Sequence, residues 1–361
     1  MYIMFNESLT KTEDNIRVCF SLKVNFDVTG SVYTTHIITL VANSLTAPTA
    51  VFGNLLVLIA VLRTKSLYSP SIVLLCCLAL SDLMVGLVAQ PCFVAHKIGE
   101  LTDNINIYCI TRVVSETAGF VTVGVSTLTL TAISVERYLA LKLHLRYREV
   151  ITCKKVLVVA ISFWLILLLL WGVRFVAHNK TFDAVVVLLL LMALGLTLGC
   201  YYQIFKTVRR HENEIKCQTT TQNESVSGAT SGQRENGIVR NSSCAQPPET
   251  EARKSRRRML RYKKSTSAMV YILGIFIVCY VPILIVNILI IIRGYTKSEK
   301  IAYVYTTTIL LMNSSLNPVV YCWRISDIRR AVKSTVNKLV RVYDVNESVN
   351  FSMERSATIA R

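Results

Sequence analysis

The sequence predicts an all-α membrane protein: a bundle of seven membrane-spanning helices with a short amphipathic eighth helix. Three observations support this prediction. Charged residues make up only 17% of the chain, whereas soluble domains carry about 25%. The mean hydropathy is +0.46. Seven apolar segments are also long enough to cross a bilayer, since about 20 helical residues span roughly 30 Å of hydrocarbon.

Each apolar segment is expected to be a helix, because backbone in contact with lipid must be hydrogen-bonded within its own segment. The segments lie at about 35–62, 71–96, 110–141, 155–177, 183–208, 266–292 and 301–322. This pattern divides the chain into an N-terminal stretch, a helix bundle and a C-terminal tail, at 1–34, 35–322 and 323–361.

Two of the remaining stretches have a distinctive composition. The fifth connection, 209–264, is rich in Ser, Thr, Gln, Asn and Gly over much of its length and poor in large apolar residues. Such a composition cannot support a core, so we expect this cytoplasmic loop to be disordered. Directly after the seventh segment, 325–332 is basic and amphipathic. It predicts a helix that lies on the anionic inner face of the membrane.

The distribution of basic residues predicts the orientation. The net charge is +18, and Lys and Arg gather in the first, third and fifth connections and in the tail. Because Lys and Arg are retained in cytoplasmic loops, we expect a plasma-membrane protein with its N-terminus outside. Asn6 and Asn179 would then begin extracellular N-glycosylation sequons. Nucleic-acid binding is not expected, because it would need a soluble basic face.

Catalysis is not expected either. The sequence contains no P-loop, no HExxH, no repeated CxxC and no paired catalytic Asp. A membrane enzyme and a transporter or channel remain the alternatives to a receptor. A transporter would need a continuous polar path or internal repeats, and no repeat is evident.

A buried acid marks the first candidate site. Asp82 lies in the middle of the second segment, where a lone carboxylate needs a cation, a proton or hydrogen-bond donors. Polar groups at a similar depth are offered by the first, third and seventh segments: Asn54, Ser126, Asn313, Ser314 and Asn317. The set suits a small hard cation such as Na⁺. The alternative is a purely structural hydrogen-bond network.

The cytoplasmic border carries the second candidate site. The third segment ends in Glu136-Arg137-Tyr138, an acid beside a base that it can hold or release. The sixth and seventh segments contain Pro282 and Pro318. Each proline removes a backbone hydrogen bond and can kink its helix, so that a small movement on one side becomes a larger one on the other.

Taken together, these residues resemble class A, rhodopsin-like G-protein-coupled receptors over about 35–335. The matching elements, in order, are Gly53-Asn54-Leu55-Leu56-Val57, Leu80-Ser81-Asp82, Glu136-Arg137-Tyr138, Trp164, Tyr201, Phe276 with Pro282, and Asn317-Pro318-Val319-Val320-Tyr321. The resemblance implies a non-enzymatic receptor for an extracellular ligand. It implies heterotrimeric G proteins, receptor kinases and arrestin as partners.

The resemblance also implies roles for single residues. Arg137 would engage the G protein once the sixth helix swings outward, and Tyr201 and Tyr321 would stabilise that open state. Leu145 would be an apolar contact for the G protein. Phe276, Tyr280 and Pro282 would form the core switch, with Tyr280 in place of the usual Trp. The family's allosteric sodium site corresponds to Asp82, Ser126, Asn313 and Asn317.

Departures from the family pattern suggest a subgroup. The second extracellular loop is short and has no Cys, so the usual bridge to the third helix is absent; Cys109 either pairs with Cys19 or remains free. The fifth helix has Ala193 where many members have Pro. These features resemble the melanocortin, adenosine, cannabinoid and lysophospholipid receptors. The sixth helix offers Arg137 no acid near 261–264, which predicts basal activity.

The expected ligand pocket holds Glu116, Gly119, Asn287 and Tyr303. Gly119 stands where monoamine receptors have an Asp, which argues against an amine ligand of that type. Glu116, one turn above, could meet a cationic group such as a peptide Arg. It could instead pair with Arg112, one turn away. These residues favour a melanocortin-like peptide or another non-amine ligand, but they do not identify the molecule.

Overall fold

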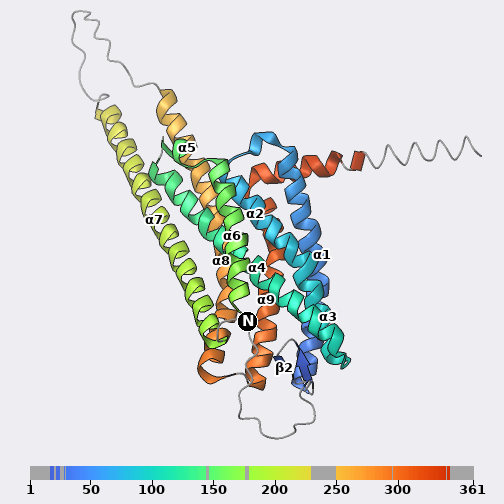
Figure 1. The fold of residues 1–361 in the computed structure, drawn as a ribbon. Helices are drawn as coiled ribbons and strands as arrows, with labels where there is room; N and C mark the ends of the chain where they lie inside the picture. Colours follow the sequence, from blue (N-terminus) through green and yellow to red (C-terminus); the bar gives the residue numbers. More distant parts are fainter. Residues whose placement is uncertain are drawn as a thin grey trace, which may run out of the picture.

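The computed structural model describes residues 17–19, 22–24, 28, 30–143, 146–174, 179–228, 249–294, 296–338 and 340–341. Its elements run in the order β1 Arg17–Cys19, β2 Leu22–Val24, α1 Ser31–Arg63, η2 Lys65–Leu67, α2 Pro70–Met84, η3 Val85–Ala89, α3 Gln90–Leu101, α4 Ile105–Leu143, α5 Tyr147–Val150, α6 Cys153–Val173, α7 Asn179–Gly228, α8 Glu249–Arg293 and α9 Lys297–Arg324. The long helices form one bundle (Figure 1).

All seven predicted segments are helical, which confirms the fold class. They correspond to α1, to the continuous span α2–η3–α3, and to α4, α6, α7, α8 and α9. Within the described part of the chain, six spans are long and apolar enough by composition alone to cross a membrane. The seventh helix, α9, is not among these spans; it carries polar residues such as Asn313, Ser314 and Asn317, which are buried in the bundle.

The second span is interrupted by a short π-helix, η3. Extra residues in a turn shift the helix face that follows, and π-bulges often occur at functional sites. Here η3 separates Asp82 from Gln90, and both side chains are fully buried. Gly86 within it permits a close approach to α1, since a Cβ there would lie 2.9 Å from Val51 Cγ2.

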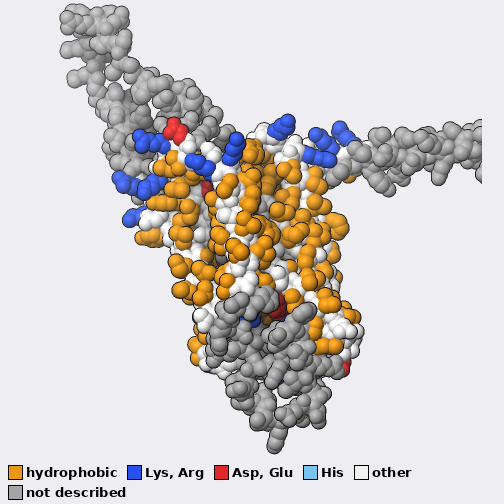
Figure 2. Space-filling view, viewed as in Figure 1, with side chains coloured by type: hydrophobic (Ala, Val, Ile, Leu, Met, Phe, Trp, Pro, Cys, Tyr) orange, Lys and Arg blue, Asp and Glu red, His pale blue; other side chains and the backbone are white. Residues whose placement is uncertain are grey.

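The two ends of the bundle differ in charge. At one end, called here the basic end, α1, α4 and α9 finish at Arg63, Leu143 and Arg324 and α6 begins at Cys153. Figure 2 shows Lys and Arg side chains gathered at this end, above a broad hydrophobic band. The other end, where α3 finishes at Leu101, is called the opposite end.

Two segments outside the bundle can be compared with the sequence predictions: the connection at 209–264 and the helix that follows α9. Helix α7 continues to Gly228 and α8 begins at Glu249, so helix occupies parts of 209–264, where the sequence predicts disorder. Lys, Arg, Glu and Gln are good helix formers, and the membrane spans supply the costly first turn. After α9, a helix at 326–338 buries Ile328, Ala331 and Thr335, as the predicted amphipathic eighth helix should.

Candidate functional site

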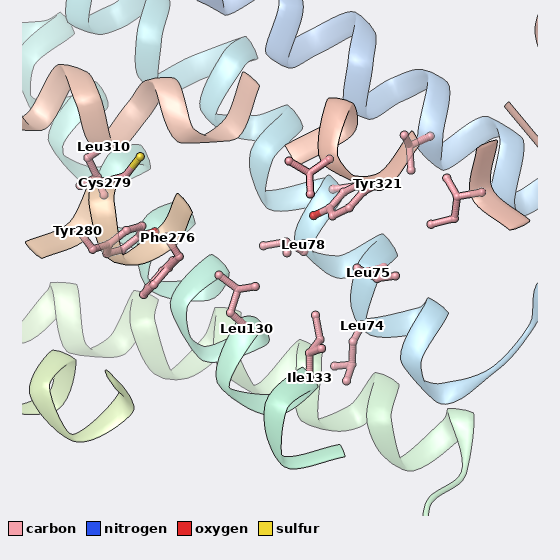
Figure 3. Close-up of a cluster of buried hydrophobic side chains, with 14 of the residues drawn as sticks. Leu74, Leu75, Leu78, Leu130, Ile133, Phe276, Cys279, Tyr280, Leu310 and Tyr321 are labelled. Atoms are coloured by element: carbon pink, nitrogen blue, oxygen red, sulfur yellow. The ribbon is translucent and has the colours of Figure 1, made fainter. Parts of the chain in front are cut away.

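The core of the site is a layer of apolar side chains between two polar regions. On α4 the order is Ser126, then Leu130 and Ile133, then Glu136; on α2 it is Asp82, then Leu78 and Leu74, then Ser71. The layer also includes Leu75, Phe276 and Tyr321 (Figure 3). Tyr321 is 0% exposed. The layer therefore separates the Asp82 region from the Arg137 region.

Hydrogen bonds to Asp82 join two of the helices that the sequence predicts, α2 and α9. Asp82 is 0% exposed. The Ser314 hydroxyl donates to its Oδ1 at 2.8 Å, and Asn317 Nδ2 donates to its Oδ2 at 2.7 Å. Each carboxylate oxygen thus has a donor and keeps a lone pair for a further partner. Ser314, which the sequence placed near Asp82 but the resemblance did not assign to the sodium site, is thus a direct partner of the carboxylate.

Neighbouring oxygens make the Asp82 region compatible with a small cation. Ser126 Oγ lies 2.9 Å from Ser81 Oγ, and Asn54 Nδ2 donates to the Ser314 carbonyl at 3.0 Å. Asn313 is buried, and its Oδ1 has no hydrogen-bond partner within the described part of the chain. In that same part, no cluster of three His, Cys, Asp or Glu side chains could hold a metal ion. One carboxylate and several neutral oxygens fit a monovalent hard cation better than a divalent one.

At the basic end, Glu136 is held from three directions. Arg137 Nε lies 3.4 Å from Glu136 Oε2. The Ser71 hydroxyl donates to Glu136 Oε1 at 2.8 Å, and the Tyr147 hydroxyl donates to the same oxygen. Burial raises the pKa of Tyr147, so this hydroxyl stays protonated and remains a donor. The Lys142 ammonium lies 5.8 Å from the centre of the Tyr138 ring.

The sequence predicted only part of this arrangement. Glu136 and Arg137 are neighbours in one motif, but Ser71 and Tyr147 belong to other elements and were not predicted. Tyr201 packs against the apolar layer, as a residue near the switch should. Leu145 lies outside the described residues.

The core switch residues form one contact chain between α8 and α4. The rings of Phe276 and Tyr280 are stacked with their centres 3.7 Å apart, and both are buried. The Tyr280 hydroxyl donates to the Val123 carbonyl on α4 at 3.3 Å. This residue, which replaces the family's usual Trp, therefore links the two helices. Pro282 lies inside α8, two residues further along.

Pro318 in α9 is packed against α1. A Cβ on Gly53 would lie 2.9 Å from the Pro318 Cγ atom. Only glycine leaves room for this contact, so Gly53 explains how α1 follows the proline-containing turn of α9. Cross-helix bonds support the same interface, since Asn43 Nδ2 donates to the Thr308 hydroxyl at 3.1 Å.

Near the opposite end, Glu116 pairs with Arg112. Arg112 Nε lies 2.9 Å from Glu116 Oε1, and Arg112 Nη1 donates to the Tyr108 hydroxyl at 2.9 Å. The Glu116 side chain is still 25% exposed. Tyr303 on α9 lies within the electrostatic reach of both Glu116 and Arg112. The pairing foreseen from the sequence is thus present, and the carboxylate keeps access to the mouth of the bundle.

Two other residues of the expected pocket can be placed, and a further acid, Asp183, lies nearby. Gly119 is buried and Asn287 is half-buried. Asp183, near the start of α7, is 2% exposed and also lies within the electrostatic reach of Tyr303. Asp183 could not be selected from the sequence, because an acid at the beginning of an apolar helix resembles an ordinary solvent-facing flank.

A second ionic group at this end was also missed. Glu100 on α3 is contacted by Lys97 Nζ at 3.0 Å and by Lys300 Nζ from α9 at 2.7 Å. His36 Nε2 on α1 lies 3.2 Å from the same carboxylate. The Glu100 side chain is 2% exposed. This cluster joins three helices at the opposite end.

The cysteine and glycosylation predictions have mixed outcomes. Cys109 is disulfide-bonded, so the alternative of a free Cys109 is wrong. Strand β1 contacts α4, the helix that carries Cys109. Asn6 lies outside the described residues, and Asn179 is the first residue of α7. Glycosylation of either remains a prediction.

Comparison with known proteins agrees with this geometry. A family model described as 7 transmembrane receptor (rhodopsin family) matches residues 53–185 and 178–321. The chain is 29% identical to sphingosine 1-phosphate receptor 2 of Homo sapiens over 301 residues, covering 78% of this chain and 71% of that receptor. It is 25% identical to melanocortin receptor 3 of Rattus norvegicus over 305 residues, with 78% and 79% covered. It is 24% identical to adenosine receptor A2b of Gallus gallus over 333 residues, with 81% and 86% covered.

Proposed function

The chain belongs to the rhodopsin family of seven-transmembrane receptors, and we propose that it lies in the plasma membrane with its basic end in the cytoplasm. A ligand bound at the opposite, extracellular end would shift the bundle toward a state that activates a heterotrimeric G protein. Receptor kinases and arrestin would act on the same cytoplasmic face. The basic residues gathered at one end support this orientation.

One observation carries the mechanism: the Arg137–Glu136 pair lies next to the apolar layer, on the side of the basic end. The 3.4 Å contact between Arg137 Nε and Glu136 Oε2 holds the arginine in this state. Tyr321 is fully buried, and its hydroxyl has no hydrogen-bond partner within the described residues. A buried hydroxyl without a hydrogen bond raises the free energy of the closed state. Opening of the layer would let the Tyr321 hydroxyl find a partner.

Opening would require α8 to leave the layer. Phe276 is packed in it, and Tyr280 is hydrogen-bonded to α4. If the Pro282 kink pivots, the basic end of α8 moves outward, and Arg137 and Tyr321 become available to the G protein. Tyr201 on α7 and Leu145 would then contact the open state or its partner. Ligand and G protein must strengthen each other's binding, because coupling between two sites is reciprocal.

A sodium ion bound at Asp82 would change the balance between the closed and open states. A sodium ion coordinated by Asp82, Ser126 and Asn313 would tie α2, α4 and α9 together and favour the closed state. The buried carboxylate and the unpartnered Asn313 oxygen support this reading. Asn317 would help to orient the carboxylate, since its amide already donates to it.

The ligand is proposed to bind among Glu116, Gly119, Asn287 and Tyr303. The partly exposed Glu116 carboxylate favours a ligand with a cationic group, such as a melanocortin-like peptide. The relatives named above are named for different molecules, so they do not select one.

The decisive test is ligand-free and ligand-stimulated nucleotide exchange on a panel of purified heterotrimeric G proteins, in membranes that contain the receptor. Peptide, lipid and nucleoside libraries would be screened against the same readout. The wild type should activate at least one G protein, and Arg137→Gln at equal surface expression should not. No activation by the wild type with any library would refute the proposal. Substrate flux in cells that lack G proteins would instead favour a transporter.

Glu116→Gln tests the pocket. The potency of a cationic agonist should fall, whereas Glu149→Gln, an exposed acid at the basic end, should leave it unchanged. Equal potency for Glu116→Gln and the wild type would remove Glu116 from the pocket.

A further inference from the structure

The basic ends of α8 and α9 meet through a group of two aromatic rings and one arginine. The Arg324 guanidinium carbon lies 3.8 Å from the centre of the Tyr271 ring and 4.9 Å from that of Trp323. The two rings meet edge to face, 5.6 Å apart. Tyr271 belongs to α8, and the other two are the last residues of α9. This group of three is called the clasp.

The clasp is not part of the buried core. Tyr271 is 45% exposed and Trp323 is 60% exposed, so neither ring gains most of its stability from burial. A cation near the face of an aromatic ring is attracted by the ring's quadrupole, and tyrosine is a good partner for arginine. The close approach of Arg324 to Tyr271 is therefore a specific interaction between two helices.

The Tyr271–Arg324 contact lies where it would oppose an outward movement of α8. Toward the opposite end, α8 and α9 are held together by apolar packing of Val286 and Ile290 against Ala302 and Tyr303. Pro282 lies between that packing and Tyr271. If α8 pivots at the proline, its packed part stays and its basic end moves, so the Tyr271–Arg324 contact must break.

The sequence makes such a restraint necessary. Many relatives hold the sixth helix inward with an acid that pairs with the motif arginine, but this chain has Arg261-Tyr262-Lys263-Lys264 in that region. A segment of this composition supplies no acid that could attract Arg137. We propose that the clasp replaces the missing acid: Arg324 holds the basic end of α8 through the Tyr271 ring and sets the basal activity. This inference rests on the proposed receptor function.

The test is basal nucleotide exchange at matched surface expression. Tyr271→Leu and Arg324→Gln should each raise the basal rate about two- to five-fold, the range that a partly exposed cation–π contact can supply. Tyr271→Phe keeps the ring and should behave as the wild type. The double variant Tyr271→Leu with Arg324→Gln should rise no further than either single variant. Tyr202→Leu, at a 66% exposed tyrosine on α7, is the control for loss of an exposed aromatic ring.

A second measurement does not depend on coupling. In the purified receptor, amide hydrogen exchange at 270–280 should be faster in Tyr271→Leu than in Tyr271→Phe. If the leucine and phenylalanine variants match the wild type in both assays, or if the double variant shows the sum of two effects, the clasp does not restrain α8. Failure of the receptor function looks different: the wild type would show no exchange that Arg137→Gln removes, whatever residue stands at 271.

Discussion

Removing the Tyr147 hydroxyl should weaken the restraint on Glu136 and raise basal activity. In the closed state this hydroxyl and that of Ser71 both donate to Glu136 Oε1. A hydrogen bond to a charged group contributes about 1.5–3 kcal/mol. Because Ser71 still donates a hydrogen bond to Glu136 Oε1, we take the low end of that range for Tyr147→Phe. If the bond is lost on opening, about 1.5 kcal/mol corresponds to roughly a tenfold rise in the open-to-closed ratio.

The assay is ligand-free guanine-nucleotide exchange in membranes, normalised to receptor at the cell surface. Tyr68→Phe is the matched control, because Tyr68 lies in the loop between α1 and α2 and is 69% exposed; it should not change the rate. Glu136→Gln serves as the positive control, since it removes the charge that holds Arg137. A raised rate in Glu136→Gln without any rise in Tyr147→Phe would refute the reasoning, because the tyrosine would then contribute nothing to holding the carboxylate.

Three further predictions concern the rest of the bundle. Replacing choline chloride by NaCl at constant ionic strength should lower basal exchange in the wild type and leave Asp82→Asn unaffected. Gly53→Ala forces a methyl group to within 2.9 Å of the proline ring of α9 and should lower the thermal midpoint, since overpacking costs about 1–3 kcal/mol; Gly195→Ala, where no atom lies within 4 Å, should not. Peptide mapping without reduction should recover Cys109 joined to Cys19, the other cysteine expected outside the membrane.

The seven helices could be predicted because each carries its signal within itself. An apolar run near 20 residues long leaves few alternatives in a membrane. The ends were harder to predict. The second span was expected to end near residue 96, yet α3 continues to Leu101 and includes Lys97 and Glu100. Both charges are buried because they meet each other and Lys300 from α9. A single sequence shows the charges but not the distant partner that makes their burial tolerable.

In the candidate site too, the residues of family motifs could be predicted, whereas their distant partners could not. The resemblance supplied Asp82 and Asn317 as members of one site, and they lie in hydrogen-bond contact at 2.7 Å. It did not supply Tyr147 or the Tyr271–Arg324 contact, which join elements far apart in the chain. Family motifs identify what many members share, and these partners lie outside the motifs that carry the resemblance.

The bonds between helices indicate which helices stay together and which helix can move. Polar side chains tie α1, α2, α3 and α9 together through short bonds: Asn54 to the Ser314 carbonyl at 3.0 Å and Lys300 to Glu100 at 2.7 Å, as well as the Asp82 group. Breaking such bonds in a membrane leaves polar groups without water. Among the described residues, helix α8 contacts α4 through the longer 3.3 Å bond from Tyr280, and it contacts α9 through apolar packing at Val286 and Ile290 and through an exposed cation–π contact.

Outward movement of the basic end of α8 would break the Tyr280 bond and the clasp and would leave the polar bonds of the α1–α2–α3–α9 frame in place. Substitutions within the α1–α2–α3–α9 frame should reduce folding and surface expression, because they leave buried polar groups unpaired. Substitutions at the Tyr280 bond and at the clasp should change basal signalling at nearly constant expression, because the proposed closed and open states differ in those contacts. In the proposed mechanism the conformational change is confined to α8, and the α1–α2–α3–α9 frame keeps the two ends of the bundle in a fixed relation while that helix moves.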